Sequence, residues 1–132
     1  MWIAQRKLVT AAELLHKKYL DQSYLIRYIK FMYTILRSEE FDVWLHTLRD
    51  LRGKARILGR IKSAENGNFG NSEPVGEGVS EMKIDFGPGY RVYYTRHELV
   101  VYVLLLGGDK STQKRDIKHA RRMALDLKRS KE

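Results

Sequence analysis

Apolar and polar residues repeat with different periods along residues 32–132, and each period predicts a different kind of element. Residues 33–36 are strand-forming types and predict a strand. Ser38 and the two glutamates after it are typical of a helix start, and apolar residues then recur at helical spacing. Gly53 interrupts this pattern, and a second helix is expected from about 54 to 65. The two helices predict an αα-hairpin.

Three later segments carry the pattern of β-strands. Residues 79–86 and 90–95 alternate between apolar and polar side chains, which predicts strands with one buried face. Residues 99–106 are apolar throughout, so we expect a strand that is covered on both faces. A glycine-rich connection precedes these strands at 66–78, and a helix follows from 112 to about 128. This order predicts an α+β domain: an αα-hairpin packed on a small, twisted, mainly antiparallel sheet, with a C-terminal helix.

Residues 1–31 have a looser pattern than the rest of the chain. Thr10 and Glu13 match a capping box, and a broken apolar stripe follows among lysines and arginines. This pattern predicts one or two moderately amphipathic helices. We interpret them as an accessory packing extension, with a membrane-surface or partner helix as the alternative. The expected boundaries are a helical N-terminal extension at 1–31 and one folded domain at 32–132.

The composition limits the chemistry that this chain can perform. Its 132 residues suffice for one domain with a core. It has no cysteine, which excludes disulfides, thiolate metal sites and a cysteine nucleophile, and its four histidines lack the spacing of metal ligands. We therefore expect no metal and no cofactor. No apolar run approaches the roughly 20 residues that span a bilayer, and no signal-peptide pattern is visible, so we expect a cytoplasmic protein without a membrane partner.

Charge gives the first indication of a partner. The chain carries 25 Lys and Arg residues against 16 Asp and Glu residues, a net charge of +9. Residues 110–132 alone contain nine basic and three acidic residues. Such an excess in a small protein usually indicates contact with nucleic acid, an anionic membrane or an acidic protein. A well-solvated surface is the plain alternative.

The hairpin between 79–86 and 90–95 predicts which side chains share a surface. Gly87–Gly89 fits a three-residue loop that pairs Phe86 with Tyr90. One face of the hairpin is then apolar, and the other carries three exposed neighbours: Lys83, Arg91 and Tyr93. Two cations beside an aromatic ring suit RNA, because cations bind phosphate and a ring stacks on a base.

Lys110 is expected to join this surface from the next strand. The apolar run 99–106 meets Gly107–Gly108, which we interpret as the residues that stop the strand and release the chain into a turn. Lys110 would then approach Arg91, and the following helix would direct its N-terminus at the same place. Further RNA-contacting candidates lie at the start of this helix: Gln113, Lys114, Arg115 and Lys118.

Each of these candidates has a structural alternative. Arg91 would pair with Asp85 across the two strands, and Tyr93 would pack at the rim of the core. The cations of the last helix would form its solvated face, which is the usual meaning of such a run.

Three blocks of the sequence carry a resemblance to a known family. They are SEEFDVWLHTLRD at 38–50, GNFGNSEPVGEGVSEMKIDFGPGYRVYY at 67–94 and LLLGGDKSTQKRDIKHA at 104–120. In order and spacing they resemble the RelE/ParE superfamily of bacterial toxins, and most closely its addiction module killer branch, which is similar to HigB-type toxins. The resemblance covers about residues 32–132, and Met32 stands where such toxins usually begin. It implies that residues 1–31 arise from an upstream start codon or as a late addition.

The resemblance implies a fold, an activity and partners. The implied fold is the αα-hairpin on a twisted antiparallel sheet with a C-terminal helix. Relatives of the RelE type are toxins of type II toxin–antitoxin modules that cleave mRNA, usually in the ribosomal A site. Their antitoxin is typically a small helix-turn-helix protein encoded next to them. By resemblance, Arg91 matches the arginine of the family's Gly-Tyr-Arg strand, Lys110 a basic residue after the last strand, and Lys83 a basic position on the preceding strand.

These matches lead to one hypothesis and two alternatives. In the hypothesis the chain is a metal-independent mRNA interferase, in which Arg91 and Lys110 bind the scissile phosphate and Lys83 assists charge stabilisation or proton transfer. The sequence lacks a counterpart of the C-terminal tyrosine that some RelE relatives use, near Asp116. The alternatives are therefore a ParE-like inhibitor of DNA gyrase on the same fold and a non-enzymatic nucleic-acid-binding protein.

Overall fold

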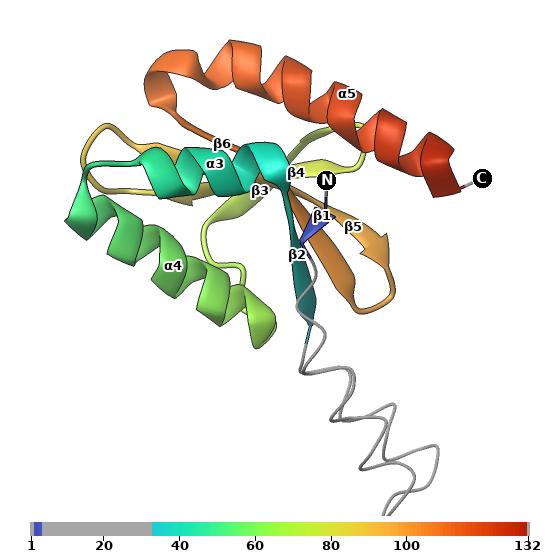
Figure 1. Ribbon diagram of the computed structural model, residues 1–132, viewed down its shortest axis with the longest axis horizontal. Helices are drawn as coiled ribbons and strands as arrows, with labels where there is room; N and C mark the ends of the chain where they lie inside the picture. Colours follow the sequence, from blue (N-terminus) through green and yellow to red (C-terminus); the bar gives the residue numbers. More distant parts are fainter. Residues whose placement is uncertain (1, 4–32, 132) are drawn as a thin grey trace, which may run out of the picture.

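A six-stranded mixed sheet organises the fold of this computed structural model, which describes residues 2–3 and 33–131 (Figure 1). The strands are β1 (Trp2–Ile3), β2 (Thr34–Ser38), β3 (Ser72–Gly76), β4 (Val79–Ile84), β5 (Tyr90–Glu98) and β6 (Val101–Asp109). They lie in the order β1-β2-β6-β5-β4-β3; β2 runs parallel to β6, and the other neighbours are antiparallel. The helices are α3 (Glu39–Thr47), α4 (Leu51–Glu65), the 3-10 turn η1 (Lys110–Thr112) and α5 (Gln113–Lys131). The predicted α+β class, with a mainly antiparallel sheet and a C-terminal helix, is confirmed.

Side-chain caps set the starts of both helices of the αα-hairpin. Ser38 accepts a hydrogen bond from the backbone N–H three residues on (2.9 Å), which confirms the predicted start of α3. Asp50 caps α4 by accepting from the N–H of Gly53 (3.0 Å). The predicted start of α4 near residue 54 is wrong, because Gly53 lies inside its first turn. A Cβ there would overlap the ring of Tyr90 and the Asp50 carboxylate, which explains the glycine.

Two apolar cores hold the helices against opposite faces of the sheet (Figure 1). The core under α3 and α4 gathers Ile35, Phe41, Leu45, Ile57, Ile61, Ala64, Met82, Ile84, Tyr90, Val92, Tyr94 and Leu104. The smaller core under α5 contains Val79, Tyr93, Val103, Leu105, Ala120 and Ala124. Val103 and Leu105 of β6 enter the core under α5, and Leu104 between them enters the other core, so the prediction that 99–106 is covered on both faces is confirmed for its central part.

Gly107 and Gly108 lie inside β6 and do not end it. Both pair with residues of β5, and the strand continues beyond them. A Cβ on Gly107 would overlap the indole ring of Trp44 on α3, and a Cβ on Gly108 would overlap the carboxylate of Asp116 on α5. The prediction that these glycines stop the strand is therefore wrong. They let a helix approach the strand closely on each face.

The hairpin between β4 and β5 differs from the prediction by two residues. Residues 85–89 form its loop, where Gly87–Gly89 alone was expected. The longer loop closes through its own backbone hydrogen bonds and uses positive φ at two glycines. Because the shift is even, every side chain stays on its predicted face. The cross-strand partners change, so that Lys83 instead of Asp85 lies opposite Arg91.

A strand, β3, forms inside the segment that the sequence predicts as a glycine-rich connection. Arginines from the two helical layers secure it and its surroundings. Arg60 of α4 donates to the backbone carbonyls of Lys83 (2.6 Å) and Phe69 (2.9 Å). Arg121 of α5 donates to the carbonyl of Val75 (2.6 Å). These long-range contacts stabilise an edge strand whose own sequence has little strand character.

The helical extension predicted at 1–31 lies outside the described residues, apart from β1. In β1, Trp2 and Ile3 pair with Ser38 and Arg37 of β2 at the edge of the sheet. No helix in the described part of the chain is long and apolar enough to cross a membrane.

Candidate functional site

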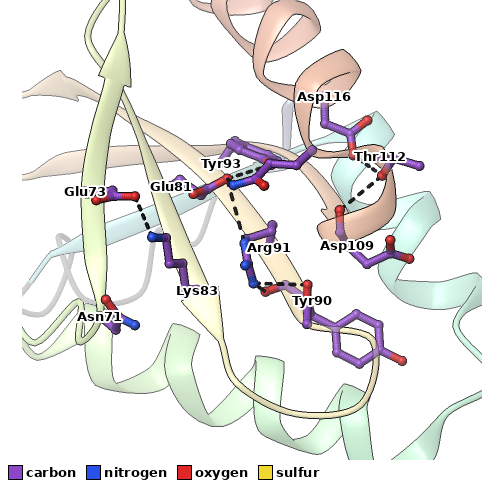
Figure 2. A network of polar contacts seen from close by, with 12 residues as sticks. Asn71, Glu73, Glu81, Lys83, Tyr90, Arg91, Tyr93, Asp109, Thr112 and Asp116 are labelled. Atoms are coloured by element: carbon purple, nitrogen blue, oxygen red, sulfur yellow. Dashed lines mark hydrogen bonds and ion pairs between the residues drawn. The ribbon is translucent and has the colours of Figure 1, made fainter.

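One end of the sheet, on the side of α5, gathers polar side chains from four elements (Figure 2). The alternation of strands β4 and β5 turns them toward the same face, and η1 with the start of α5 adds the rest. We call this set the polar cluster: Glu81, Lys83, Arg91, Tyr93, Lys110, Thr112, Gln113 and Asp116. In register, Arg91 lies between Lys83 of β4 and Gly108 of β6, so it is central to the cluster.

Arg91 and Lys110 meet over Gly89, as the sequence predicts. The backbone N–H of Lys110 donates to the carbonyl of Gly89 (2.9 Å), which carries the β5–β6 pairing into the turn. A Cβ on Gly89 would lie 3.4 Å from both Nη1 of Arg91 and Cβ of Lys110. Lys110 is exposed, and its ammonium makes no hydrogen bond or ion pair with the described residues. The guanidinium of Arg91 and the Cβ of Lys110 therefore lie beside the same glycine, and no described residue engages the ammonium of Lys110.

Glu81 is a buried carboxylate that sequence reasoning missed. It is 1% exposed, and its Oε2 accepts hydrogen bonds from the hydroxyl of Tyr93 (2.9 Å) and the side-chain amide of Gln113 (2.8 Å). The same oxygen lies 3.9 Å from Nε of Arg91. A buried charge needs such partners to offset its lost hydration. The strand alternation that places Lys83 on this face also places Glu81 there, so the signal was present in the sequence.

Tyr93 is buried and presents no ring to a ligand. It is 0% exposed in the core under α5, and its hydroxyl donates to Glu81. Burial, followed by the hydrogen bond to Glu81, raises the pKa of Tyr93, so the hydroxyl stays a donor. The prediction of an exposed base-stacking ring is wrong, because α5 covers the face that the hairpin alone leaves open. Gln113, another RNA-contacting candidate, likewise turns its amide inward to Glu81.

The guanidinium of Arg91 is held from inside the polar cluster. The side chain is 11% exposed, and Nη1 donates to the backbone carbonyls of Gly89 (3.1 Å) and Tyr90 (3.2 Å). Nε faces Glu81 and has no hydrogen-bond partner. The alternative partner Asp85 is exposed in the loop and makes no ion pair with Arg91. Within the described ranges Nη2 makes no hydrogen bond, so it is the donor left for a ligand.

Lys83 lies opposite Arg91 in register, but its ammonium points elsewhere. It forms an ion pair with Glu73 of β3 (2.5 Å), on the side away from Arg91 (Figure 2). The structure therefore brings together Arg91 and Lys110 of the predicted catalytic trio, and leaves the ammonium of Lys83 at the periphery.

The chain enters α5 through a turn that its own side chains stabilise. Asp109 accepts hydrogen bonds from the backbone N–H (2.8 Å) and hydroxyl (2.5 Å) of Ser111. The hydroxyl of Thr112 donates to Asp116 (2.5 Å), a carboxylate that is 7% exposed. Outside this turn lies a hollow of about 470 Å³ lined by residues 110–115. The positive end of the helix dipole faces this region and favours anions.

Three further RNA-contacting candidates lie on the outer surface of α5. Lys114, Arg115 and Lys118 are exposed. Arg115 is 79% exposed, with Nε 3.8 Å from Asp116. Lys118 lines a second hollow of about 420 Å³ next to Arg115. Their positions extend the positive surface from Lys110 along the helix, where they are open to solvent or to a polyanion.

The opposite face of the sheet supports the loop that carries Gly89. The hydroxyl of Tyr90 donates to Asp50 (2.7 Å), the cap of α4. Burial, and then this hydrogen bond, raise the pKa of Tyr90 to about 12. Hydrogen bonds from Gly53 and then Tyr90 lower the pKa of Asp50. The αα-hairpin thereby fixes the start of β5, next to Arg91.

Chemically, the polar cluster is suited to bind an oxyanion. It offers an open guanidinium nitrogen and an unengaged ammonium near the positive end of a helix dipole. In the described part of the chain, no group of three or more His, Asp or Glu residues is placed to hold a metal ion.

The fold and site define an α+β domain with a basic polar cluster at one end of its sheet. The chain is similar to a protein of Haemophilus influenzae (strain ATCC 51907 / DSM 11121 / KW20 / Rd): the two are 51% identical over 87 residues, which cover 66% of this chain and 88% of that protein. The chain belongs to the same family as this protein, which is named only as an uncharacterized protein. No protein-family model and no solved structure matches the chain.

Proposed function

We propose that this protein is a toxin of a type II toxin–antitoxin module, in the addiction module killer branch of the RelE/ParE superfamily, and that it acts as a metal-independent mRNA interferase. One observation carries the proposal. Arg91 and Lys110 flank Gly89 beside the start of α5, at the positions where the resemblance expects two functional cations. A net charge of +9 supports a polyanionic target.

Cleavage would proceed through attack of a 2′-hydroxyl on the adjacent phosphorus. The 2′-oxygen bonds to phosphorus and gives up its proton, while the bond to the 5′-oxygen breaks and that oxygen takes up a proton. The products are a 2′,3′-cyclic phosphate and a 5′-hydroxyl. Nη2 of Arg91 and the ammonium of Lys110 bind the non-bridging oxygens, where negative charge develops. Lys83, paired with Glu73, contributes positive charge from β4.

The partners in this proposal follow from the same resemblance. The cognate antitoxin is a small helix-turn-helix protein encoded by the adjacent gene. The targets are mRNA and the ribosome in the cytoplasm. Lys114, Arg115 and Lys118 on the outer surface of α5 contact the RNA backbone, since exposed cations supply most of the sequence-independent affinity for nucleic acid.

A ParE-like inhibitor of DNA gyrase is the second candidate, and the burial of Tyr93 favours it. With Tyr93 fully covered, none of the side chains predicted to contact RNA offers an aromatic ring for base stacking. A gyrase inhibitor needs no such ring at this position.

Induction of the protein in a bacterial host, followed by mapping of mRNA 5′ ends, separates these functions. The wild-type protein should stop growth and produce new 5′ ends within coding regions. Arg91→Ala should abolish both effects, and Lys110→Ala should reduce them, because each removes a cation from the phosphate. Arg129→Ala, the same kind of charge loss at the far end of α5, is the control and should remain toxic.

Three results would contradict the interferase proposal. Growth arrest with intact mRNA and induction of a DNA-damage reporter would establish that the protein inhibits DNA gyrase. No growth arrest and no cleavage would leave a non-enzymatic nucleic-acid-binding protein. Full toxicity of Arg91→Ala would show that the site lies elsewhere.

A further inference from the structure

We infer that Glu81 is a positioning residue, which holds the guanidinium of Arg91 in place for phosphate binding without touching the RNA itself. The inference rests on the proposed function, since it assigns Arg91 to the phosphate. It concerns a residue that neither the sequence pattern nor the resemblance singled out. Its basis is the environment of one buried carboxylate in the polar cluster (Figure 2).

Glu81 is shielded from any substrate. It is 1% exposed, and its neighbours come from β5 and α5, which cover it on the outer side of the sheet. A general base must reach the proton that it removes, directly or through one water molecule. The Tyr93 hydroxyl and the Gln113 amide already occupy Oε2. Glu81 therefore acts through its neighbours.

The hydrogen bonds to Glu81 hold its carboxylate in one position relative to Arg91. Tyr93 and Gln113 are neutral donors that fix the carboxylate between β5 and α5. The charge of the carboxylate then faces its ion-pair partner, Nε of Arg91, at 3.9 Å. A buried carboxylate without this cation would carry an uncompensated charge, so the two groups are mutually dependent.

The contacts of Arg91 divide its nitrogens between the protein and a ligand. Nη1 is bound by the carbonyls of Gly89 and Tyr90, and Nε faces Glu81. Nη2 remains for the phosphate. Without Glu81 the guanidinium would keep its charge but lose the contact that fixes its tilt, and the backbone carbonyls alone would allow it to swing about Nη1.

The pair also has room to tighten when phosphate binds. Nε of Arg91 and Oε1 of Glu81 are both buried without a hydrogen-bond partner. Nε lies 3.9 Å from Oε2, and a charged N–H···O hydrogen bond is about 2.7–2.9 Å long, so a movement of roughly 1 Å would bring Nε within hydrogen-bond distance of the Glu81 carboxylate. Arg91 can thus engage phosphate and gain a hydrogen bond on its inner side in the same movement.

The test is Glu81→Gln, which removes the charge and keeps the shape, in single-turnover cleavage of mRNA on purified ribosomes. We expect the rate at saturating RNA to fall at least tenfold while the half-saturating RNA concentration changes less than threefold. Glu81→Asp retains the charge and should recover part of the rate. Glu98→Gln, the same change at the exposed far end of β5, should cleave at the wild-type rate.

A double-mutant cycle with Arg91→Lys then shows whether Glu81 acts through Arg91. In the Arg91→Lys background Glu81→Gln should lower the cleavage rate less than threefold, because the guanidinium that Glu81 orients is already absent. An equal loss in both backgrounds overturns the inference, as does a Glu81→Gln protein that cleaves at the wild-type rate. If Glu81→Gln does not fold, the Glu81→Asp variant carries the same cycle.

A second readout does not depend on cleavage. In the wild-type protein the Nε–H of Arg91 should give a resolved, slowly exchanging NMR signal, and Glu81→Gln should broaden or remove it. A signal unchanged by the substitution overturns the inference whatever the activity. Conversely, a wild-type protein that shows the signal but cleaves no RNA refutes the interferase function and leaves the Glu81–Arg91 coupling standing.

Discussion

The two faces of the sheet are built from the same strands but bury different chemistry. Under α3 and α4 the residues of the buried core are aliphatic and aromatic. Under α5 the apolar core is smaller, and toward the start of α5 the buried groups become Glu81, Asp116 and the hydroxyl of Tyr93. Strand β5 contributes alternate residues to both, with Arg91 between Tyr90 and Val92.

This difference separates stability from function within one sheet. An apolar face gains free energy roughly in proportion to the area that it buries. A buried carboxylate and guanidinium contribute little net stability, because their mutual attraction mainly offsets the loss of hydration. Polar groups held in such a place are therefore best explained by what they bind. The face under α3 and α4 acts as the support, and the end of the other face acts as the candidate site.

The largest expected effect on stability lies on the supporting face. Ile57 is 0% exposed, and Ile57→Ala should lower the free energy of unfolding by about 2–5 kcal/mol, since it removes buried methyl groups and leaves a cavity. Leu58→Ala is the matched control: Leu58 is 40% exposed, so its loss should be much smaller. Denaturant unfolding measures both. Equal losses would show that this face is not packed as described.

Two glycine substitutions should have opposite signs. Gly107→Ala should destabilise the protein by about 1–3 kcal/mol, because the new methyl group overlaps the indole of Trp44. Gly59 lies in α4 with open space around the position of a Cβ, so Gly59→Ala should stabilise by about 0.5–1 kcal/mol. Thermal melts of the two variants compare them directly. A stabilising Gly107→Ala would contradict the close approach of α3 to β6.

The smallest expected effect concerns the hydrogen bond from Tyr90 of β5 to Asp50, the cap of α4. The folded-state pKa of Tyr90 is raised to about 12, so the contribution of its hydroxyl is present below pH 10 and is lost as the pH rises toward 12. Asp50 has a lowered pKa, so its contribution is lost in acid. Tyr90→Phe should therefore lose stability at neutral pH and show a flatter decline at both extremes. Melts as a function of pH test this, and an unchanged profile would contradict the Tyr90–Asp50 hydrogen bond.

Features that depend on one residue or on a short run of neighbouring residues are predicted well from the sequence. Three such features are observed: Ser38 caps α3, side chains around Arg91 alternate between the two faces of the sheet, and Lys110 approaches Arg91 beside Gly89. Other features depend on contacts between distant segments. Gly107 and Gly108 are glycines because Trp44 and Asp116 lie against them, and no local pattern distinguishes that from a strand end.

The same reason explains the errors in the predicted site. Tyr93 looks exposed in an isolated hairpin, and only the position of α5 shows that it is buried. Glu81 has the alternation of a surface residue, and its burial follows from the same helix. The two-residue change in register kept the faces but gave Arg91 a different neighbour across the strand.

We propose that the polar cluster centred on Arg91 cleaves RNA, while the opposite face of the sheet provides stability. The most direct test is cleavage of an mRNA on purified ribosomes by the wild-type protein, Arg91→Ala and Ile57→Val, each with its melting temperature. We predict that Arg91→Ala, which leaves the buried Glu81 without its cation and so melts lower, cleaves at least 100-fold more slowly at a temperature at which it is fully folded. Ile57→Val also melts lower, but it cleaves at the wild-type rate. Cleavage by Arg91→Ala at the wild-type rate would contradict the proposal that this cluster cleaves RNA.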